Sequence, residues 1–301
     1  MKVKIIWAIA ALSAATLLTG CVSASHVGTF SQAASQAATD ISNGFDQIQA
    51  TTITRKMSDL ASDTNHVTDD VFIGLLNNNQ MAPRLAYLAE LKKYADSLGN
   101  LANANYSKNV DSASKDLYGS LNGLAQTYQK ATTQSLPFTT NDTAIIATAI
   151  DAIGNAIVEY KRQSALRTII LKTDPSIQLV CADFEKTFNG LHQDQFIYQN
   201  LESVVADLSG AYNEQTVRWN YAERMTYLTR IQQARIIRDN ADAFIVAAAK
   251  SAGALAKAHK ALADAAKLGK LDSAETTQAI GELVDEANQA KRFYDNVRSG
   301  N

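Results

Sequence analysis

The sequence lacks the motifs by which many enzymes and metalloproteins are recognised. It has no Gly-x-Ser-x-Gly elbow, no phosphate-binding loop and no dinucleotide-binding fingerprint, and its glycines fall singly. Its histidines show no zinc-type spacing, and the Glu-x-x-His pattern of di-iron bundles is absent at all four: His26, His66, His192 and His259. We therefore predict no catalytic residue, no metal site and no cofactor.

The sequence also has few charged residues. Charged residues make up 19% of the chain, the formal net charge is −2 and the isoelectric point is near 6.1. A nucleic-acid-binding domain needs a basic face, and none is visible, so we expect no nucleic-acid partner. The hydrophobic content of 46% is ordinary for a folded protein.

Proline and cysteine are scarce, with three and two residues in 301. Asp174-Pro175 is typical of a helix start, and residues 136–141, which include Pro137, are typical of a loop. Cys181 follows Leu179 and Val180 in an apolar stretch, where a buried core residue is favoured over a nucleophile.

The N-terminus carries an export signal. Lys2 and Lys4 precede an apolar run over residues 5–18, which is too short for a spanning helix of about 20 residues. The four residues Leu18-Thr19-Gly20-Cys21 resemble the lipobox of bacterial lipoproteins. The resemblance implies cleavage before Cys21 and attachment of diacylglycerol to its thiol, with acylation of the new amino terminus. The alternative is an ordinary secretory signal followed by a chance cysteine.

Val22 bears on the destination of such a lipoprotein. Lipoproteins kept at the inner membrane of Gram-negative cells usually carry Asp at this position, so the resemblance implies an outer-membrane location if the source is Gram-negative. With Cys21 used for the lipid, Cys181 has no partner for an intramolecular disulfide, and stability must come from packing.

Apolar residues recur at steps of three and four through the rest of the chain, which predicts an all-α fold. We expect an elongated antiparallel bundle of long helices with coiled-coil-like packing. The predicted ranges are about 30–62, 68–77, 82–131 with a break between Gly99 and Asn109, 142–172, 175–214, 216–268 and 272–298. The domain assignment is a signal at 1–20, a lipidated tether at 21–29 and a bundle at 30–301, with a sub-boundary near 132–141.

The clearest apolar stripes define the predicted core. One runs from Phe184 to Tyr212 with Gln195 as its polar member, and a second ends at Tyr128. A third runs from Ile146 to Tyr160, and a fourth from Phe244 to Ala265. Asp272 and Glu275 have the spacing of a capping box for the last helix, after Gly269 ends the one before.

One segment combines arginine with aromatic residues, the side chains that dominate protein-binding hot spots. The candidate partner surface consists of Arg218, Trp219, Arg224, Tyr227 and Arg230. The alternative is a long helix with solvated or ion-paired arginines and with Tyr221, Met225, Leu228 and Ile231 packed inward. A second charged candidate is a lysine face, Lys257, Lys260 and Lys267, directed towards anionic lipid or cell-wall polymer.

Two functional hypotheses follow. The first is an exported, membrane-anchored lipoprotein that acts by protein–protein contact, either as an envelope assembly component or as a neutraliser of an incoming protein. The second is a ligand-binding or wall-interacting lipoprotein with a pocket between its helices. No residue set supports an enzyme.

The substitution Cys21→Ser tests the anchor. Serine cannot take the diacylglycerol in the family that the lipobox resembles, so we expect the lipid mass to disappear and the protein to leave the membrane or to remain as an uncleaved precursor. Mass spectrometry distinguishes these forms. A cleaved, serine-bearing protein that still sediments with membranes in high salt and alkaline carbonate would contradict the lipid anchor.

Overall fold

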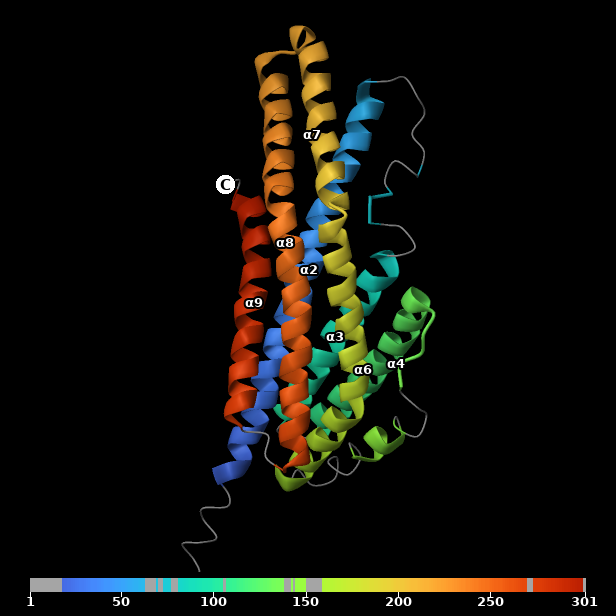
Figure 1. Cartoon of the computed structure of the whole chain (residues 1–301), viewed down its shortest axis with the longest axis vertical. Helices are drawn as coiled ribbons and strands as arrows, with labels where there is room; N and C mark the ends of the chain where they lie inside the picture. Colours follow the sequence, from blue (N-terminus) through green and yellow to red (C-terminus); the bar gives the residue numbers. More distant parts are fainter. Residues whose placement is uncertain are drawn as a thin grey trace, which may run out of the picture.

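The computed structural model describes residues 18–62, 69, 73–76, 81–104, 107–137, 142, 144–149, 159–269 and 273–299. The described part is all-α, and the helices form an elongated bundle, as the sequence predicts (Figure 1). The principal elements are α2 (Leu18–Ser62), α3 (Met81–Ala102), α4 (Ser107–Thr132), α6 (Glu159–Gln193), α7 (Phe196–Gln215), the 3-10 turn η2 (Thr216–Arg218), α8 (Tyr221–Lys267) and α9 (Ala274–Ser299).

Two helices set the length of the bundle. α2 has 45 residues and α8 has 47, so each extends about 70 Å at 1.5 Å per residue. They are antiparallel, because Phe30 of α2 contacts His259 near one end, and Ser58 hydrogen bonds with Tyr227 near the other. α9 packs along both of them, α6 packs along α8, and α3 joins α2 to α4.

A continuous chain of aromatic rings crosses the middle of the bundle. It runs Tyr128, Tyr87, Phe184, Phe188, Phe45, Phe244 and Phe293, with successive ring centroids 4.5–5.8 Å apart. These residues come from α4, α3, α6, α2, α8 and α9, so every principal helix except α7 contributes to it. Such pairs contribute about 0.5–1.5 kcal/mol each beyond their buried area.

Two of the predicted stripes are buried as expected. In α4 these are Ala113, Leu117, Leu121, Leu124 and Tyr128, and in α8 they are Phe244, Ala248, Leu255, Leu262 and Ala265. In the third stripe Ile146 is buried, whereas Ile153 and Ile157 lie outside the described residues. One core includes buried residues on both sides of the loop near 132–141.

The start of α2 differs from the sequence prediction. The helix begins at Leu18 rather than near residue 30, so the range expected as a tether, 21–29, is helical. Ala24 and Val27 are buried. The prediction was wrong because Val27 and Phe30 begin an apolar face that needs α8 and α9 to cover it, and a single-sequence pattern does not show that cover.

Asp174-Pro175 does not start a helix, since Pro175 lies inside α6. An internal proline removes one backbone hydrogen bond and costs about 3 kcal/mol in an isolated helix. The helix nevertheless continues here, because Ile170 and Ile177 on either side are fully buried in the core. Asp174 does not cap the helix but binds His259 of α8.

The long helix predicted for 175–214 instead breaks at Asp194 and Gln195. Gln195 has φ 49°, and α7 starts again at Phe196. After the break, Ile197 and Val204 are also buried, whereas Tyr198 is 39% exposed. The predicted Phe184–Tyr212 stripe is therefore confirmed at Phe184, Phe188, Leu201, Val205 and Leu208, which are buried, but not at Tyr198 or at Gln195, a turn residue at the surface.

The remaining boundaries are closer to prediction. α3 ends at Ala102 and α4 begins at Ser107, inside the predicted break between Gly99 and Asn109. Residues 73–76, expected within a short helix, are not helical. Gly269 follows α8 with φ 78°, as predicted for the residue that ends it. The cap of α9 is Ser273, whose Oγ accepts the Thr276 amide at 3.1 Å; Asp272 lies outside the described residues.

Gly44 provides a test of the aromatic chain. A Cβ at this position would overlap the Phe244 ring, whereas a Cβ at Gly281 in α9 would meet nothing within 4 Å. We expect Gly44→Ala to lower the free energy of unfolding by about 1–3 kcal/mol through overpacking, despite the better helix propensity of alanine. Gly281→Ala should raise it by up to about 1 kcal/mol. Urea unfolding measures both, and a stabilised Gly44→Ala protein would contradict the packing.

Candidate functional site

The α7–α8 hairpin forms one end of the bundle, opposite the start of α2 (Figure 1). Its tip, residues 217–228, comprises the end of η2 and the first two turns of α8. Residues 21 and 62 of α2 are about 60 Å apart along the helix axis, and the tip lies beside the far end. The five residues predicted as a partner surface lie in or directly after this tip.

A capping box fixes the turn at the tip. The Asn220 side chain accepts the Glu223 amide at 3.0 Å, and the Glu223 carboxylate accepts the Asn220 amide at 2.7 Å. α8 therefore begins at Tyr221, later than the predicted residue 216. The Asn-x-x-Glu spacing is a known N-terminal signal, so this cap was readable from the sequence although we did not identify it.

Three aromatic residues hold the hairpin together below the turn. Trp219 packs against Tyr227 with ring centroids 4.7 Å apart, and Tyr212 lies 5.9 Å from Trp219. The Tyr227 hydroxyl hydrogen bonds with Ser58 of α2. Of the predicted partner surface, Trp219 and Tyr227 thus have a structural role, and both remain partly exposed.

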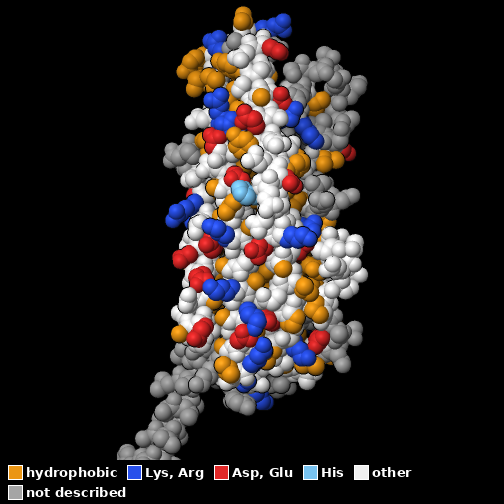
Figure 2. All heavy atoms as spheres, in the orientation of Figure 1, with side chains coloured by type: hydrophobic (Ala, Val, Ile, Leu, Met, Phe, Trp, Pro, Cys, Tyr) orange, Lys and Arg blue, Asp and Glu red, His pale blue; other side chains and the backbone are white. Residues whose placement is uncertain are grey.

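Several large apolar side chains at the tip face solvent. Val217 is 90% exposed, Tyr221 73%, Met225 45% and Leu228 41%. The alternative that placed Tyr221, Met225 and Leu228 in the core is therefore wrong, and only Ile231 of that set is buried. Hydrophobic side chains gather visibly at this end of the molecule (Figure 2).

The arginines of the hairpin are mostly unpaired. Arg238 binds Glu202 and Asp239, each at 2.7 Å. In the part of the chain that the structure describes, the side chains of Arg218, Arg224 and Arg230 form neither an ion pair nor a hydrogen bond. The tip therefore combines exposed apolar groups with positive charges that have no internal partner.

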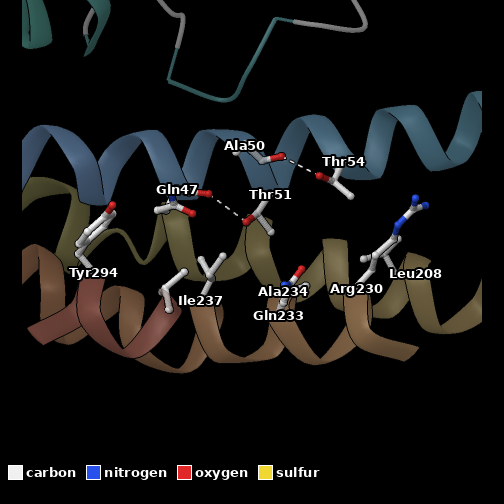
Figure 3. A pocket seen from close by; sticks show the side chains of 11 residues that line it. Gln47, Ala50, Thr51, Thr54, Leu208, Arg230, Gln233, Ala234, Ile237 and Tyr294 are labelled. Carbon is white, nitrogen blue, oxygen red and sulfur yellow. Dashed lines mark hydrogen bonds between the residues drawn. The ribbon is translucent and has the colours of Figure 1, made fainter. Parts of the chain in front are cut away.

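A cleft of about 390 Å³ lies just below the tip, between α2 and α8 (Figure 3). Arg230 and Ile237 of α8 line one side, and Gln47 and Thr54 of α2 line the other. Tyr294 and Val297 of α9 close its lower end. A second groove, of about 420 Å³, runs between α7 and α8 and is lined by Tyr212, Leu228 and Arg235 among others.

The predicted lysine face carries little free charge. Lys257 pairs with Glu282 at 2.5 Å, and both Lys260 and Lys267 pair with Asp264, at 2.5 and 2.9 Å. All three lysines are thus ion-paired, with two carboxylates between them, Asp264 of α8 and Glu282 of α9. This removes the basis for a strongly cationic, lipid-binding face.

His259 belongs to a buried polar cluster rather than to an accessible site. It is 0% exposed, its Nδ1 lies 3.0 Å from Asp174 and its Nε2 lies 2.9 Å from the Tyr94 hydroxyl. Burial raises the pKa of Tyr94, which therefore stays protonated and can donate to Nε2. Burial opposes ionisation of Asp174, but the hydrogen bond with His259 holds its pKa below the ordinary value.

The other cysteine and histidine candidates, where described, are buried in the core or contact polar side chains of a neighbouring helix. Cys181 is buried in the core, as predicted, and burial raises the pKa of its thiol, which disfavours a nucleophilic thiolate. His192 binds Asp242, and His26 lies 3.1 Å from Thr277. The side chain of Cys21 and the whole of His66 lie outside what the structure describes.

Searches over the described residues identify no metal-binding cluster and no helix apolar enough to cross a membrane. Protein-family models, curated proteins and solved structures contain no match to this chain.

The Asp174–His259 contact predicts a pH dependence of stability. Because the folded pKa of Asp174 lies below its unfolded value of about 3.9, the contact stabilises the fold above that pH and its contribution is lost as the pH falls through the folded pKa. We expect Asp174→Asn to lower the free energy of unfolding by about 1–3 kcal/mol at pH 7 and by less near pH 3. Urea titrations at both pH values measure the difference.

Asp40 is a control of opposite sign. It is buried beside Gln36, and burial raises the pKa of its carboxyl despite that hydrogen bond. Asp40→Asn should therefore stabilise the protein at neutral pH, with a gain that shrinks as the pH falls through the raised pKa. Equal losses from both variants at every pH would show that neither carboxylate acts as described.

Proposed function

We propose that this chain is an exported lipoprotein without catalytic activity, anchored to the membrane through lipid on Cys21, that acts by binding another protein with the tip of its α7–α8 hairpin. The observation that carries the proposal is the tip itself. Val217 and Tyr221 are largely exposed there, beside Arg218 and Arg224, which have no internal partner in the described part of the chain.

The chemistry of the tip supports a protein partner. Tyrosine, tryptophan and arginine are the residues most enriched in binding hot spots, and all three types occur within residues 218–230. Leaving four large apolar side chains in water is unfavourable for an isolated bundle, so their exposure favours a surface that is covered in use. Arg218, Arg224, Arg230 and Arg235, whose side chains form no ion pair with any described residue, favour a partner surface that carries carboxylates.

The course of α2 supports the same assignment. The helix continues from the proposed lipid attachment site to the level of the tip without a break. A lipid on Cys21 would therefore place the contact surface about 60 Å from the membrane, at the end that a partner in the envelope can reach. Val22 favours the outer membrane in a Gram-negative source. The partner is then an envelope assembly component or an incoming protein that the lipoprotein neutralises.

A second candidate function is ligand binding in the cleft below the tip. Its volume of about 390 Å³ falls within the usual range of ligand pockets, about 300–1,000 Å³. A ligand at 100 times its dissociation constant would raise the free energy of unfolding by about 2.7 kcal/mol. Unchanged melting curves with sugars, peptides, lipids and cell-wall fragments would remove this alternative.

The double substitution Val217→Asp with Tyr221→Asp tests the proposed contact. Both side chains are largely exposed, so the fold should retain its stability, while partner recovery by crosslinking in intact cells should fall at least tenfold, or about 1.4 kcal/mol. The matched control is Leu268→Asp, at a site 80% exposed at the other end of α8. It should leave recovery unchanged. Equal recovery from the tip variant and the control would refute the assignment of the tip.

A further inference from the structure

The groove between α2 and α8 is filled along most of its length by α9. The buried face of α9 consists of Ala279, Ile280, Leu283, Ala287, Ala290 and Phe293, and α9 packs on both long helices. Its last turns, at Tyr294 and Val297, form the lower wall of the 390 Å³ cleft. The cleft is therefore the continuation of the groove beyond the point where α9 ends.

Both sides of the cleft have the spacing of a helix-packing face. α2 contributes Gln47, Ala50, Thr51 and Thr54, and α8 contributes Arg230, Gln233, Ala234 and Ile237. Each set occupies positions i, i+3, i+4 and i+7, which lie along one face of a helix. Seven residues extend about 11 Å, or two helical turns. We call these eight residues the helix seat; in Figure 3 its two halves line the cleft from opposite ribbons.

The threonine hydroxyls of the seat donate hydrogen bonds within α2. The Thr51 hydroxyl donates to the Gln47 carbonyl and the Thr54 hydroxyl to the Ala50 carbonyl, both at 2.9 Å (Figure 3). With their hydroxyls bonded to the backbone of their own helix, these threonines can offer methyl groups to the cleft. Ala50 and Ala234 are small, so another helix can approach the two backbones closely.

Arg230 supplies the only charge of the seat. It is exposed, and within the described residues its side chain forms no hydrogen bond or ion pair. A carboxylate from an occupant could bind this guanidinium without breaking an existing contact. The seat thus favours an occupant with small or apolar side chains on one face and an acidic side chain towards the tip.

We propose that the helix seat receives a helix of about two turns from the partner protein, which lies in line with α9 and places an aspartate or glutamate against Arg230. This inference rests on the proposed function and extends it, because it names the secondary structure and the charge of the segment that is bound. It commits to a helix because the same two-helix groove already holds one, namely α9.

Neighbouring glutamines provide a matched crosslinking experiment. Gln233 lines the seat, whereas Gln232 lines the groove between α7 and α8, and both are exposed on α8. A photoreactive amino acid is introduced at either position in the full-length lipidated protein in its own cells. We expect position 233 to crosslink at least fivefold more strongly than 232, to a segment with helical apolar spacing and an acidic residue.

Substitutions separate the contributions of charge and shape. Arg230→Glu should reduce the crosslink from position 233 at least tenfold and Arg230→Lys should retain part of it, whereas Arg235→Glu, in the other groove, should leave it unchanged. Ala50→Trp should abolish it by filling the seat. Because Ala50 is exposed, the melting temperature of the Ala50→Trp protein should stay near that of the parent. An unchanged melting temperature excludes unfolding as the cause of the lost crosslink.

The outcomes distinguish this inference from the proposed function. Crosslinks from position 217 at the tip without any from 233 would overturn the helix seat and leave the tip as the contact. Crosslinks from neither position would overturn both. A crosslink at 233 to a segment without helical spacing, or one that Arg230→Glu does not weaken, would overturn the helix and its acidic residue.

Discussion

The chain of aromatic rings across the bundle is the constraint on which the other features depend. It joins six helices at one level, from Tyr128 in α4 to Phe293 in α9. Phe244 lies between Phe45 and Phe293, and the missing side chain of Gly44 allows it to approach α2. Towards the hairpin tip, beyond this level, α9 soon ends and the described part of the bundle continues mainly as α2, α7 and α8. The cleft is open and the tip is exposed because fewer helices surround them.

Two polar clusters, one partly buried and one buried, complement the rings by joining α3 to α6. The Arg84 side chain holds Asp183 at 2.9 and 3.1 Å, and the Tyr87 hydroxyl donates to the same carboxylate. Nearer the start of α2, Tyr94, Thr173, Asp174 and His259 form the second cluster, which also reaches α8. Buried networks of this kind are satisfied in one arrangement of the helices, so they specify the register that apolar packing alone leaves less certain.

The sequence predicted the fold class well because helical periodicity is a local property of the chain. It failed where tertiary contacts override local preference, as at Pro175, which core packing keeps inside a helix, and at Gln195, where a turn interrupts the predicted helix. The candidate site shows the same division. The arginine and aromatic composition near Trp219 was visible, but the exposure of Tyr221 and Leu228 was not. Periodicity shows that a helix has an apolar face. Only the structure shows that, within the described part of the chain, no helix covers the apolar residues at the start of α8.

The unbroken course of α2 has a mechanical consequence. Many surface-tethered proteins explore a hemisphere around a flexible linker, and their binding site sweeps through a large volume. Here the helix starts at Leu18 and Val27 is already buried in the core. Almost no flexible linker would therefore separate a lipid on Cys21 from the bundle. The molecule would pivot as a stiff rod about its lipid, and the tip would stay within a shell of nearly constant radius. Such a rod would restrict binding to targets that lie at about its own length from the bilayer.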